Sequence, residues 1–219
     1  MCGIVGVVRF DGQPQERMIL ERMTDALAHR GPEGRGVHLV AERGISVGLG
    51  HARLKVVDLS EAAGQPMSSD DGATQVVFNG ELYNFRELRA SLEQRGCRFR
   101  TSSDTEVLLR CYEAEGERCV ESLDGMFAFA VWDGRRRRLF LARDRVGKKP
   151  LFYVLTPALF AFASEIKALL RHPEITPEVH AEALPAFFLY GYVPSPETLY
   201  RGIRQLAPGH RLTVDAGGE

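Results

Sequence analysis

Short apolar runs alternate along this chain with segments in which apolar residues recur at helical spacing. The run 4–10 is rich in β-branched residues and stops at Asp11-Gly12, which predicts a buried strand that enters a turn. From Met18 to Leu27 the apolar spacing predicts a helix, which ends in the loop 29–32. Further strands are predicted within 45–57 and at 75–78, 126–131, 138–143, 151–154 and 159–163.

Turn and capping residues place other elements. Asn79-Gly80 is predicted to close the strand at 75–78, because Asn-Gly is the preferred dipeptide of a tight hairpin turn. Leucines at helical spacing predict a helix over 84–95. A further helix is expected to start at Ser103 or Asp104, since either side chain can cap a helix N-terminus.

The order of these elements indicates the fold class. Strands and helices occur in clusters rather than in strict alternation, which predicts an α+β layered sandwich instead of a doubly wound sheet. The proline-containing tail from Leu184 is expected to be less regular. With 219 residues, 44% of them hydrophobic, the chain is expected to form one domain with a sizeable core.

Charge and cysteine content narrow the class of partner. The chain has 28 basic and 29 acidic residues, so no net field attracts it to nucleic acid or to an anionic membrane. No stretch approaches the ~20 apolar residues that span a bilayer. The four cysteines lack metal-ligand spacing, and the start lacks a basic leader, so we expect free thiols, no metal site and a cytoplasmic protein. A small molecule or another protein is the expected partner.

Cys2 is notable for its position. A small residue at position 2 permits removal of Met1, which would leave a thiol and a free α-amine on one residue. A free thiol titrates near ~8.5 and an α-amine near ~7.7–8.0, so the neutral amine can accept the thiol proton. The alternative is an incidental cysteine at a chain terminus, and position alone favours that alternative.

Motifs along nearly the whole chain alter that balance. They are Met1-Cys2-Gly3-Ile4-Val5-Gly6, His29-Arg30-Gly31-Pro32, Gly50-His51-Ala52-Arg53-Leu54, Gln65-Pro66-Met67, Phe78-Asn79-Gly80-Glu81-Leu82-Tyr83-Asn84, Ser103-Asp104-Thr105-Glu106, Asp124-Gly125-Met126-Phe127-Ala128-Phe129, Ala142-Arg143-Asp144-Arg145-Val146-Gly147-Lys148-Lys149-Pro150-Leu151 and Ser164-Glu165-Ile166-Lys167. In their order and spacing these segments resemble the class II glutamine amidotransferases, and within that family the N-terminal domain of glutamine-hydrolysing asparagine synthetases.

The resemblance assigns catalysis to Cys2, Asn79 and Gly80. Attack of a thiol on an amide develops negative charge on the amide oxygen, which an oxyanion hole must stabilise. The side-chain amide of Asn79 and the backbone N–H of Gly80 are suitable donors. The same dipeptide is also a common hairpin turn, and a turn beside Cys2 would present both donors.

The resemblance also implies residues that bind glutamine: Arg53, Leu54, Glu81 and Asp104. A guanidinium can hold the α-carboxylate through two parallel hydrogen bonds, and Asp104, with help from Glu81, would pair with the α-ammonium. Taken singly, Arg53 could be a solvated strand charge and Asp104 a helix cap. The other motifs favour the binding roles.

The loop of His29, Arg30, Gly31 and Pro32 is expected to close over bound glutamine and exclude water. A histidine base is unnecessary if the α-amine acts, so His51 is interpreted as structural. The basic run 135–138 is interpreted as a solvated hairpin tip, because no aromatic platform for nucleic acid accompanies it.

The resemblance further implies a four-layer αββα sandwich of the N-terminal-nucleophile hydrolase type, with 2–219 as the amidotransferase domain. No metal or cofactor is expected for glutamine hydrolysis, whereas ATP and Mg²⁺ would belong to a synthetase domain whose pyrophosphate-loop motif does not occur here. The chain is then a fragment or a stand-alone glutaminase that passes ammonia to a partner.

The expected function is hydrolysis of L-glutamine to glutamate and ammonia, which supplies ATP-dependent asparagine synthesis from aspartate. Two alternatives remain open: an amidotransferase domain that serves another synthase, and a regulatory module without activity. A homodimer is an expectation of the resemblance only.

Overall fold

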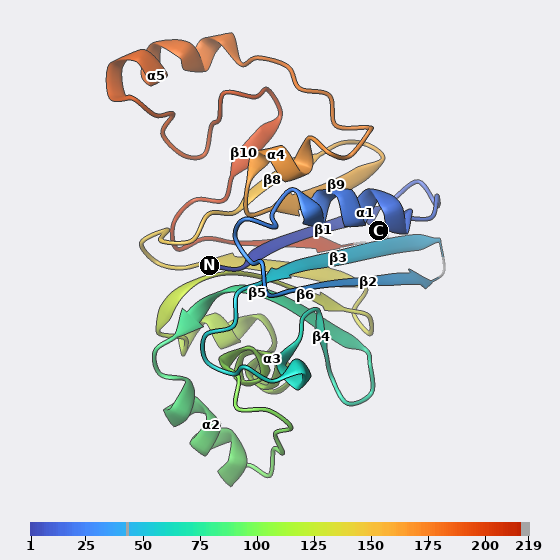
Figure 1. Ribbon diagram of the computed structural model, residues 1–219, viewed down its shortest axis with the longest axis vertical. Coiled ribbons are helices and arrows are strands. Elements are labelled where there is room, and N and C mark those ends of the chain that lie inside the picture. Colours follow the sequence, from blue (N-terminus) through green and yellow to red (C-terminus); the bar gives the residue numbers. More distant parts are fainter. Residues whose placement is uncertain (43, 216–219) are drawn as a thin grey trace.

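Two antiparallel sheets lie face to face in the computed structural model, which describes residues 1–42 and 44–215 (Figure 1). The first sheet has the order β10-β8-β9-β1-β3-β2. Its strands are β1 (Gly3–Arg9), β2 (Gly34–Glu42), β3 (Ile45–Arg53), β8 (Phe152–Leu155), β9 (Leu159–Ala163) and β10 (Ile203–Gln205). The second has the order β11-β7-β6-β5-β4 and consists of β4 (Met67–Ser68), β5 (Thr74–Leu82), β6 (Gly125–Asp133), β7 (Arg138–Arg143) and β11 (Arg211–Asp215).

Helices cover the outer face of each sheet (Figure 1). The helices are α1 (Arg17–Asp25), α2 (Phe85–Gln94), α3 (Asp104–Glu115), α4 (Ile166–Leu169) and α5 (Leu184–Tyr190), with short 3₁₀ turns at Glu61–Ala63, Gly116–Glu121 and Ala181–Ala183. α1 and α4 pack on the first sheet, and α3 packs on the second with α2 beside it. None of the helices in the described part of the chain is long and apolar enough to cross a membrane.

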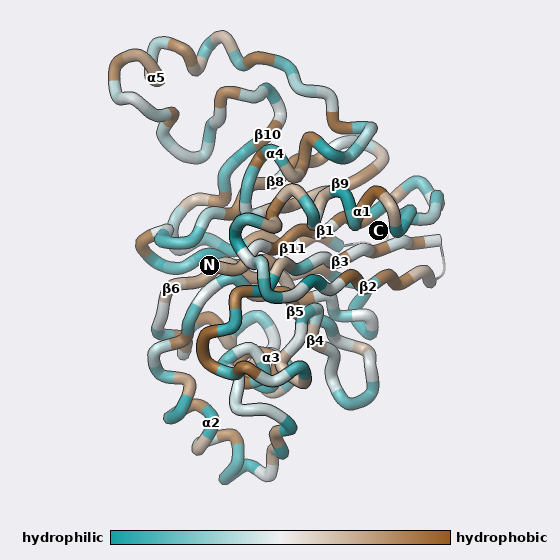
Figure 2. The backbone as a smooth tube through the Cα atoms, viewed as in Figure 1, coloured by the Kyte–Doolittle hydropathy of each residue, from teal (hydrophilic) through white to brown (hydrophobic). Residues whose placement is uncertain are grey.

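Three apolar layers hold the molecule together. In β1, Ile4 lies in the layer between the sheets, whereas Val5 lies in the layer under α1 and α4. In β5, Val77 faces the other sheet, and Phe78 packs in the layer beside α3. Because both faces of these strands are buried, β1 reads as a nearly continuous apolar run, and so does 76–78 in the middle of β5. Figure 2 shows hydrophobic residues along the central strands. The predicted α+β four-layer αββα sandwich is confirmed.

Two sequence predictions were wrong. Asn79-Gly80 is not a turn, because β5 continues through it to Leu82 and pairs with β6 along its whole length. The tail after Leu184 is more regular than predicted, since it contributes α5 and the edge strands β10 and β11, which pair with β8 and β7. Local signals were overridden in both cases by pairing with strands far away in sequence.

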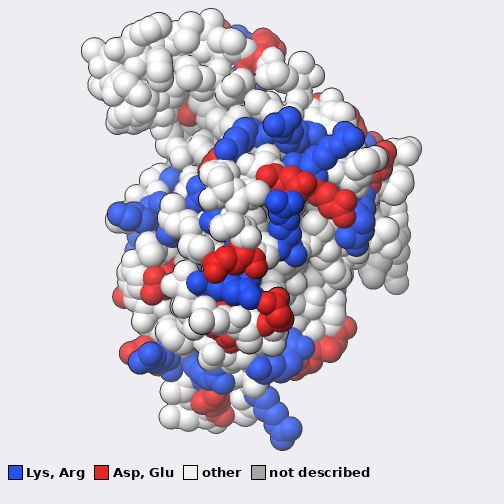
Figure 3. Space-filling model, viewed as in Figure 1, with Lys and Arg blue, Asp and Glu red and all other residues white. Residues whose placement is uncertain are grey.

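Segment 181–196, called here the α5 lobe, projects from one end of the molecule (Figure 1). Helix α5 has no buried residue, and Phe188 is 80% exposed. In the view of Figure 3 the lobe is almost free of charged side chains, unlike the face formed by the two sheets. Its exposed large apolar residues are Phe187, Phe188, Leu189, Tyr190 and Tyr192.

Candidate active site

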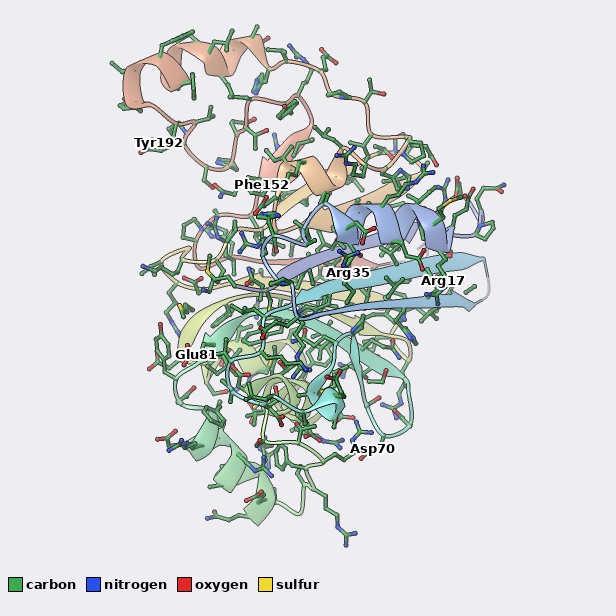
Figure 4. All side chains as sticks on the ribbon, viewed as in Figure 1. Arg17, Arg35, Asp70, Glu81, Phe152 and Tyr192 are labelled. Carbon is green, nitrogen blue, oxygen red and sulfur yellow. The ribbon has the colours of Figure 1, made fainter. Side chains whose placement is uncertain are left out.

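The site forms where strands from both sheets come together near the start of β1. Gly3 pairs with Ala52, so Cys2 lies beside the end of β3 at Arg53. The end of β5 and the start of α3 contribute further residues, and Figure 4 shows Glu81 near that end of β5. One pocket is lined by Met1, Cys2, Arg53, Leu54, Val56, Val57, Asp58, Ala63, Gln65, Phe78, Asn79, Gly80, Glu81, Ser103, Asp104, Thr105, Met126 and Lys149.

Backbone contacts fix the position of Cys2. The N–H of Leu54 points at Sγ over 3.4 Å, and the thiol lies 3.5 Å from the carbonyl oxygen of Leu54. On the other side, Nε of Arg30 donates to the carbonyl oxygen of Cys2 at 2.9 Å. Burial raises the pKa of the thiol, while the Leu54 N–H and the charge of the chain's N-terminus oppose that effect. The thiol therefore needs a base to become a nucleophile.

Asn79 carries an amide with no partner. Its side chain is 0% exposed, and neither Oδ1 nor Nδ2 makes a hydrogen bond to any described residue. Leaving a buried polar group unpaired costs about 1–3 kcal/mol, so such groups are rare unless a ligand completes them. An amide of this kind in the pocket of Cys2 is placed to donate to a bound molecule.

Gly80 is required by close packing. A Cβ at this position would lie under 3.0 Å from the carbonyl oxygen of Met126 and from Cα of Phe127 on the neighbouring strand β6. The neighbouring strand therefore leaves no room for a side chain at position 80. Packing is thus a second reason for glycine here, beside the expected close approach of substrate.

Arg53 and Asp104 give the pocket one charge of each sign. Arg53 is 6% exposed, and its guanidinium donates to the carbonyl oxygens of Ser60 and Asp58 at 2.8 and 2.7 Å. Asp104 is 5% exposed and accepts from the N–H of Leu82 at 3.1 Å. Among the described residues neither forms an ion pair. A zwitterionic amino acid would satisfy both charges.

The cap of α3 settles one alternative for Asp104. Oγ of Ser103 accepts from the N–H of Thr105 at 3.1 Å, so Ser103 is the capping side chain and Asp104 is the first helical residue. Burial raises the pKa of Asp104 to about 6, and the neighbouring carboxylate of Glu81 adds to the rise. This carboxylate is therefore held in an environment that favours a cationic partner.

The loop 29–32 lies behind Cys2 and does not line the pocket. His29 is exposed, with Nε2 3.0 Å from Oε1 of Glu165, and Arg30 contacts the same oxygen at 2.9 Å. The covering role of this loop stays a prediction. His51 is fully buried, and burial lowers the pKa of its imidazole to about 3, so the ring is neutral, in keeping with a structural role.

Gln65 and Lys149 are among the lining residues that were not predicted as site residues from the sequence. Gln65 connects two parts of the site, because Nε2 donates to Oγ1 of Thr105 and Oε1 accepts from the N–H of Phe78. Lys149 is a buried lysine in a loop. Both stand in segments that resemble the family, which was the available signal, but neither spacing nor periodicity indicates that their side chains are buried.

The layered fold is that of the N-terminal-nucleophile hydrolases, and comparison with known proteins identifies the family. Over residues 1–219 the chain matches the family described as "glutamine amidotransferase domain", and it belongs to that family. It is similar to asparagine synthetase [glutamine-hydrolyzing] 3 of Bacillus subtilis, with 46% identity over 100% of this chain and 35% of that protein. A putative asparagine synthetase [glutamine-hydrolyzing] 2 of Methanocaldococcus jannaschii is 35% identical over 98% of this chain and 44% of its own length.

Solved structures show the same fold. Glutamine phosphoribosylpyrophosphate amidotransferase from B. subtilis, complexed with ADP and GMP, superposes with a TM-score of 0.70 at 22% identity, covering 99% of this chain and 48% of that one. The chain spans 35% and 44% of the length of the two curated relatives named above.

Proposed function

We propose that this domain hydrolyses L-glutamine to glutamate and ammonia, with the thiol of Cys2 as nucleophile after removal of Met1. The observation that carries the proposal is the buried, unpartnered amide of Asn79 in the pocket of Cys2. A structural asparagine in a core would have its hydrogen bonds made within the protein. An amide that donates to an oxyanion during the reaction needs no hydrogen-bond partner within the free protein.

The proposed reaction uses residues that line the pocket. The α-amine of Cys2 accepts the thiol proton, and the thiolate attacks the side-chain amide carbon of glutamine. Nδ2 of Asn79 and the N–H of Gly80 stabilise the oxyanion, and the N–H of Leu54 faces the attacking sulfur. The protonated amine then gives its proton to the departing nitrogen, which leaves as ammonia. Water hydrolyses the resulting thioester to glutamate and restores Cys2.

Substrate recognition uses the two charges. Arg53 binds the α-carboxylate, and Asp104 binds the α-ammonium with Glu81 beside it. A glutaminyl side chain within a protein lacks both charged groups, so this pair selects the free amino acid. We propose that the loop 29–32 moves over the pocket when glutamine is bound.

In the whole protein the ammonia is proposed to serve ATP-dependent asparagine synthesis from aspartate in the cytoplasm. The partner is a synthetase domain or a separate protein, which would hold ATP and Mg²⁺; the glutaminase half-reaction needs no metal or cofactor. The names of the relatives support aspartate as the ammonia acceptor, since one curated protein named above is called an asparagine synthetase and the other a putative asparagine synthetase. A homodimer stays an expectation of the resemblance.

The experiment is ammonia release from L-glutamine by the wild type, Cys2→Ala and Cys97→Ala, with intact masses to establish whether Met1 is gone. Cys97 is a half-buried thiol outside the pocket and serves as the matched control. We expect activity in the processed wild type and in Cys97→Ala, and none in Cys2→Ala. Absence of activity in a wild type that begins at Cys2, with an asparagine synthetase partner domain supplied, would favour the regulatory module.

A further inference from the structure

Lys149 is a cation held inside the pocket by a rigid loop between β7 and β8. Its side chain lines the pocket and is 4% exposed, which is rare for lysine. Its N–H donates to Oδ2 of Asp144 at 3.0 Å, and its carbonyl oxygen accepts from Nε of Arg143 at 2.6 Å. Asp144 is itself fully buried and also accepts from the N–H of Phe127 on β6. The loop is thus anchored at the backbone of Lys149.

The ammonium group of Lys149 has a poor partner in the described structure. Nζ lies 3.0 Å from Sδ of Met1, and no carboxylate of the described residues forms an ion pair with it. A thioether is a weak acceptor, and an unpaired buried charge costs stability. Packing therefore does not explain why a lysine stands here.

The surroundings of Nζ contain charges of both signs. Burial lowers the pKa of Lys149, and the guanidinium of Arg30 acts in the same direction. The carboxylates of Asp144 and Glu81 and the thiolate form of Cys2 oppose them. Around the thiol itself the charged groups are Asp104, Arg53 and the chain's N-terminus.

Removal of Met1 changes what Lys149 faces. The thioether leaves, and the new α-amine of Cys2 forms at the bond by which Met1 was attached. Two ammonium groups in one buried pocket repel each other, which disfavours the state in which both are charged. An α-amine ordinarily titrates near ~7.7–8.0 and lysine near ~10.4, so the α-amine loses its proton first.

We propose that Lys149 is a positioning residue for the proposed glutaminase reaction, whose buried ammonium group keeps the α-amine of Cys2 unprotonated and ready to accept the thiol proton. Lys149 exchanges no proton itself: the thiol proton moves to the α-amine and then to ammonia. A general base is most effective when its pKa lies close to the working pH. A cation beside the α-amine lowers the pKa of that amine and so helps to tune the base.

The test titrates the α-amine directly. Protein labelled with ¹⁵N-cysteine, with Met1 removal verified by intact mass, is followed from pH 5 to 10 through the ¹⁵N chemical shift of Cys2. Cys2 is the one cysteine of the sequence whose nitrogen is then an amine. We expect Lys149→Met to move the titration midpoint upward by about one pH unit, the effect of losing a nearby charge of like sign. Lys149→Gln is a second variant with the same expected result should Lys149→Met fold poorly.

Two controls separate charge from position. Lys148→Met alters the exposed neighbour in the same loop and should keep the wild-type midpoint, as should Lys149→Arg, which retains the charge. The acid limb of kcat/KM for glutamine should shift with the amine, so that Lys149→Met loses about tenfold at a pH below both midpoints. An unchanged amine midpoint in both neutral variants would overturn the proposal. A wild type that begins at Cys2 and releases no ammonia even with a synthetase partner domain supplied would instead contradict the proposed function, while the amine titration would still decide the role of Lys149.

Discussion

At the residue scale, substitution of Asn79 should change activity far more than stability, because its amide is unpaired. We expect Asn79→Ala to lower kcat by about 10²–10³-fold, as loss of one oxyanion donor does. The free energy of unfolding should fall little, because the variant also removes a buried polar group without a partner. Steady-state kinetics and urea unfolding measure the two effects.

Asn84 provides the matched control. Both polar atoms of its amide have a partner, since Nδ2 donates to the carbonyl oxygen of Ser122 and Oδ1 accepts from the N–H of Asp124. Asn84→Ala should therefore destabilise the fold and leave kcat near the wild-type value. A large loss of stability in Asn79→Ala, with kcat preserved, would mean that Asn79 is a structural residue.

Asp104 should couple stability to pH in an unusual direction. Burial raises the pKa of its carboxyl from an ordinary 3.8 to about 6, so the folded protein binds this proton more tightly than the unfolded chain does. Ionisation then opposes folding, and the free energy of unfolding decreases as pH rises from about 4 to about 6. Asp104→Asn should be more stable than the wild type above pH 6, by up to about 3 kcal/mol, and equal to it near pH 3.

Urea unfolding of both proteins at pH 3, 5 and 8 measures this difference. The same variant should show a raised KM for glutamine at pH 8, since the α-ammonium loses its charged partner. If Asp104→Asn and the wild type had equal free energies of unfolding at both pH 3 and pH 8, ionisation of Asp104 would not oppose folding.

At the element scale, buried strands were predictable and their continuations were not. The run 4–10 and the pair 138–143 and 159–163 have both faces buried, so their composition alone identifies them. Asn79-Gly80 was assigned to a turn by its local preference, but nine residues of pairing with β6 outweigh one dipeptide. β2 was not predicted because its side chains are mostly half-buried at a sheet edge.

Only some residues of the candidate site were predictable from the sequence. Cys2 is notable for its place in the chain, but position alone favours an incidental cysteine. Cys2, Arg53, Asn79 and Asp104 were therefore all selected through the resemblance, and all of them line one pocket. Lys149 could not be predicted, because the burial of a lysine depends on how Asp144 and Arg143 fold its loop. Those contacts arise from tertiary structure and leave no periodic pattern.

At the scale of the whole molecule, stability comes from the three apolar layers, and the α5 lobe stands apart from them (Figure 1). Tyr192 marks the lobe in Figure 4, far from Glu81 at the site. Large apolar side chains of the lobe are exposed in the described structure, so the lobe contributes little buried area to the fold and lies apart from the proposed active site.

This separation predicts the result of a paired substitution. Phe188→Ser should change the free energy of unfolding by no more than about 0.5 kcal/mol, because the ring is 80% exposed and buries little apolar area. Leu20→Ala, in the fully buried layer between α1 and the first sheet, should cost about 2–5 kcal/mol. Urea unfolding at several protein concentrations makes the measurement. A concentration-dependent loss in Phe188→Ser would show that the lobe is covered in solution by a second copy of the chain, since only association gives stability such a dependence.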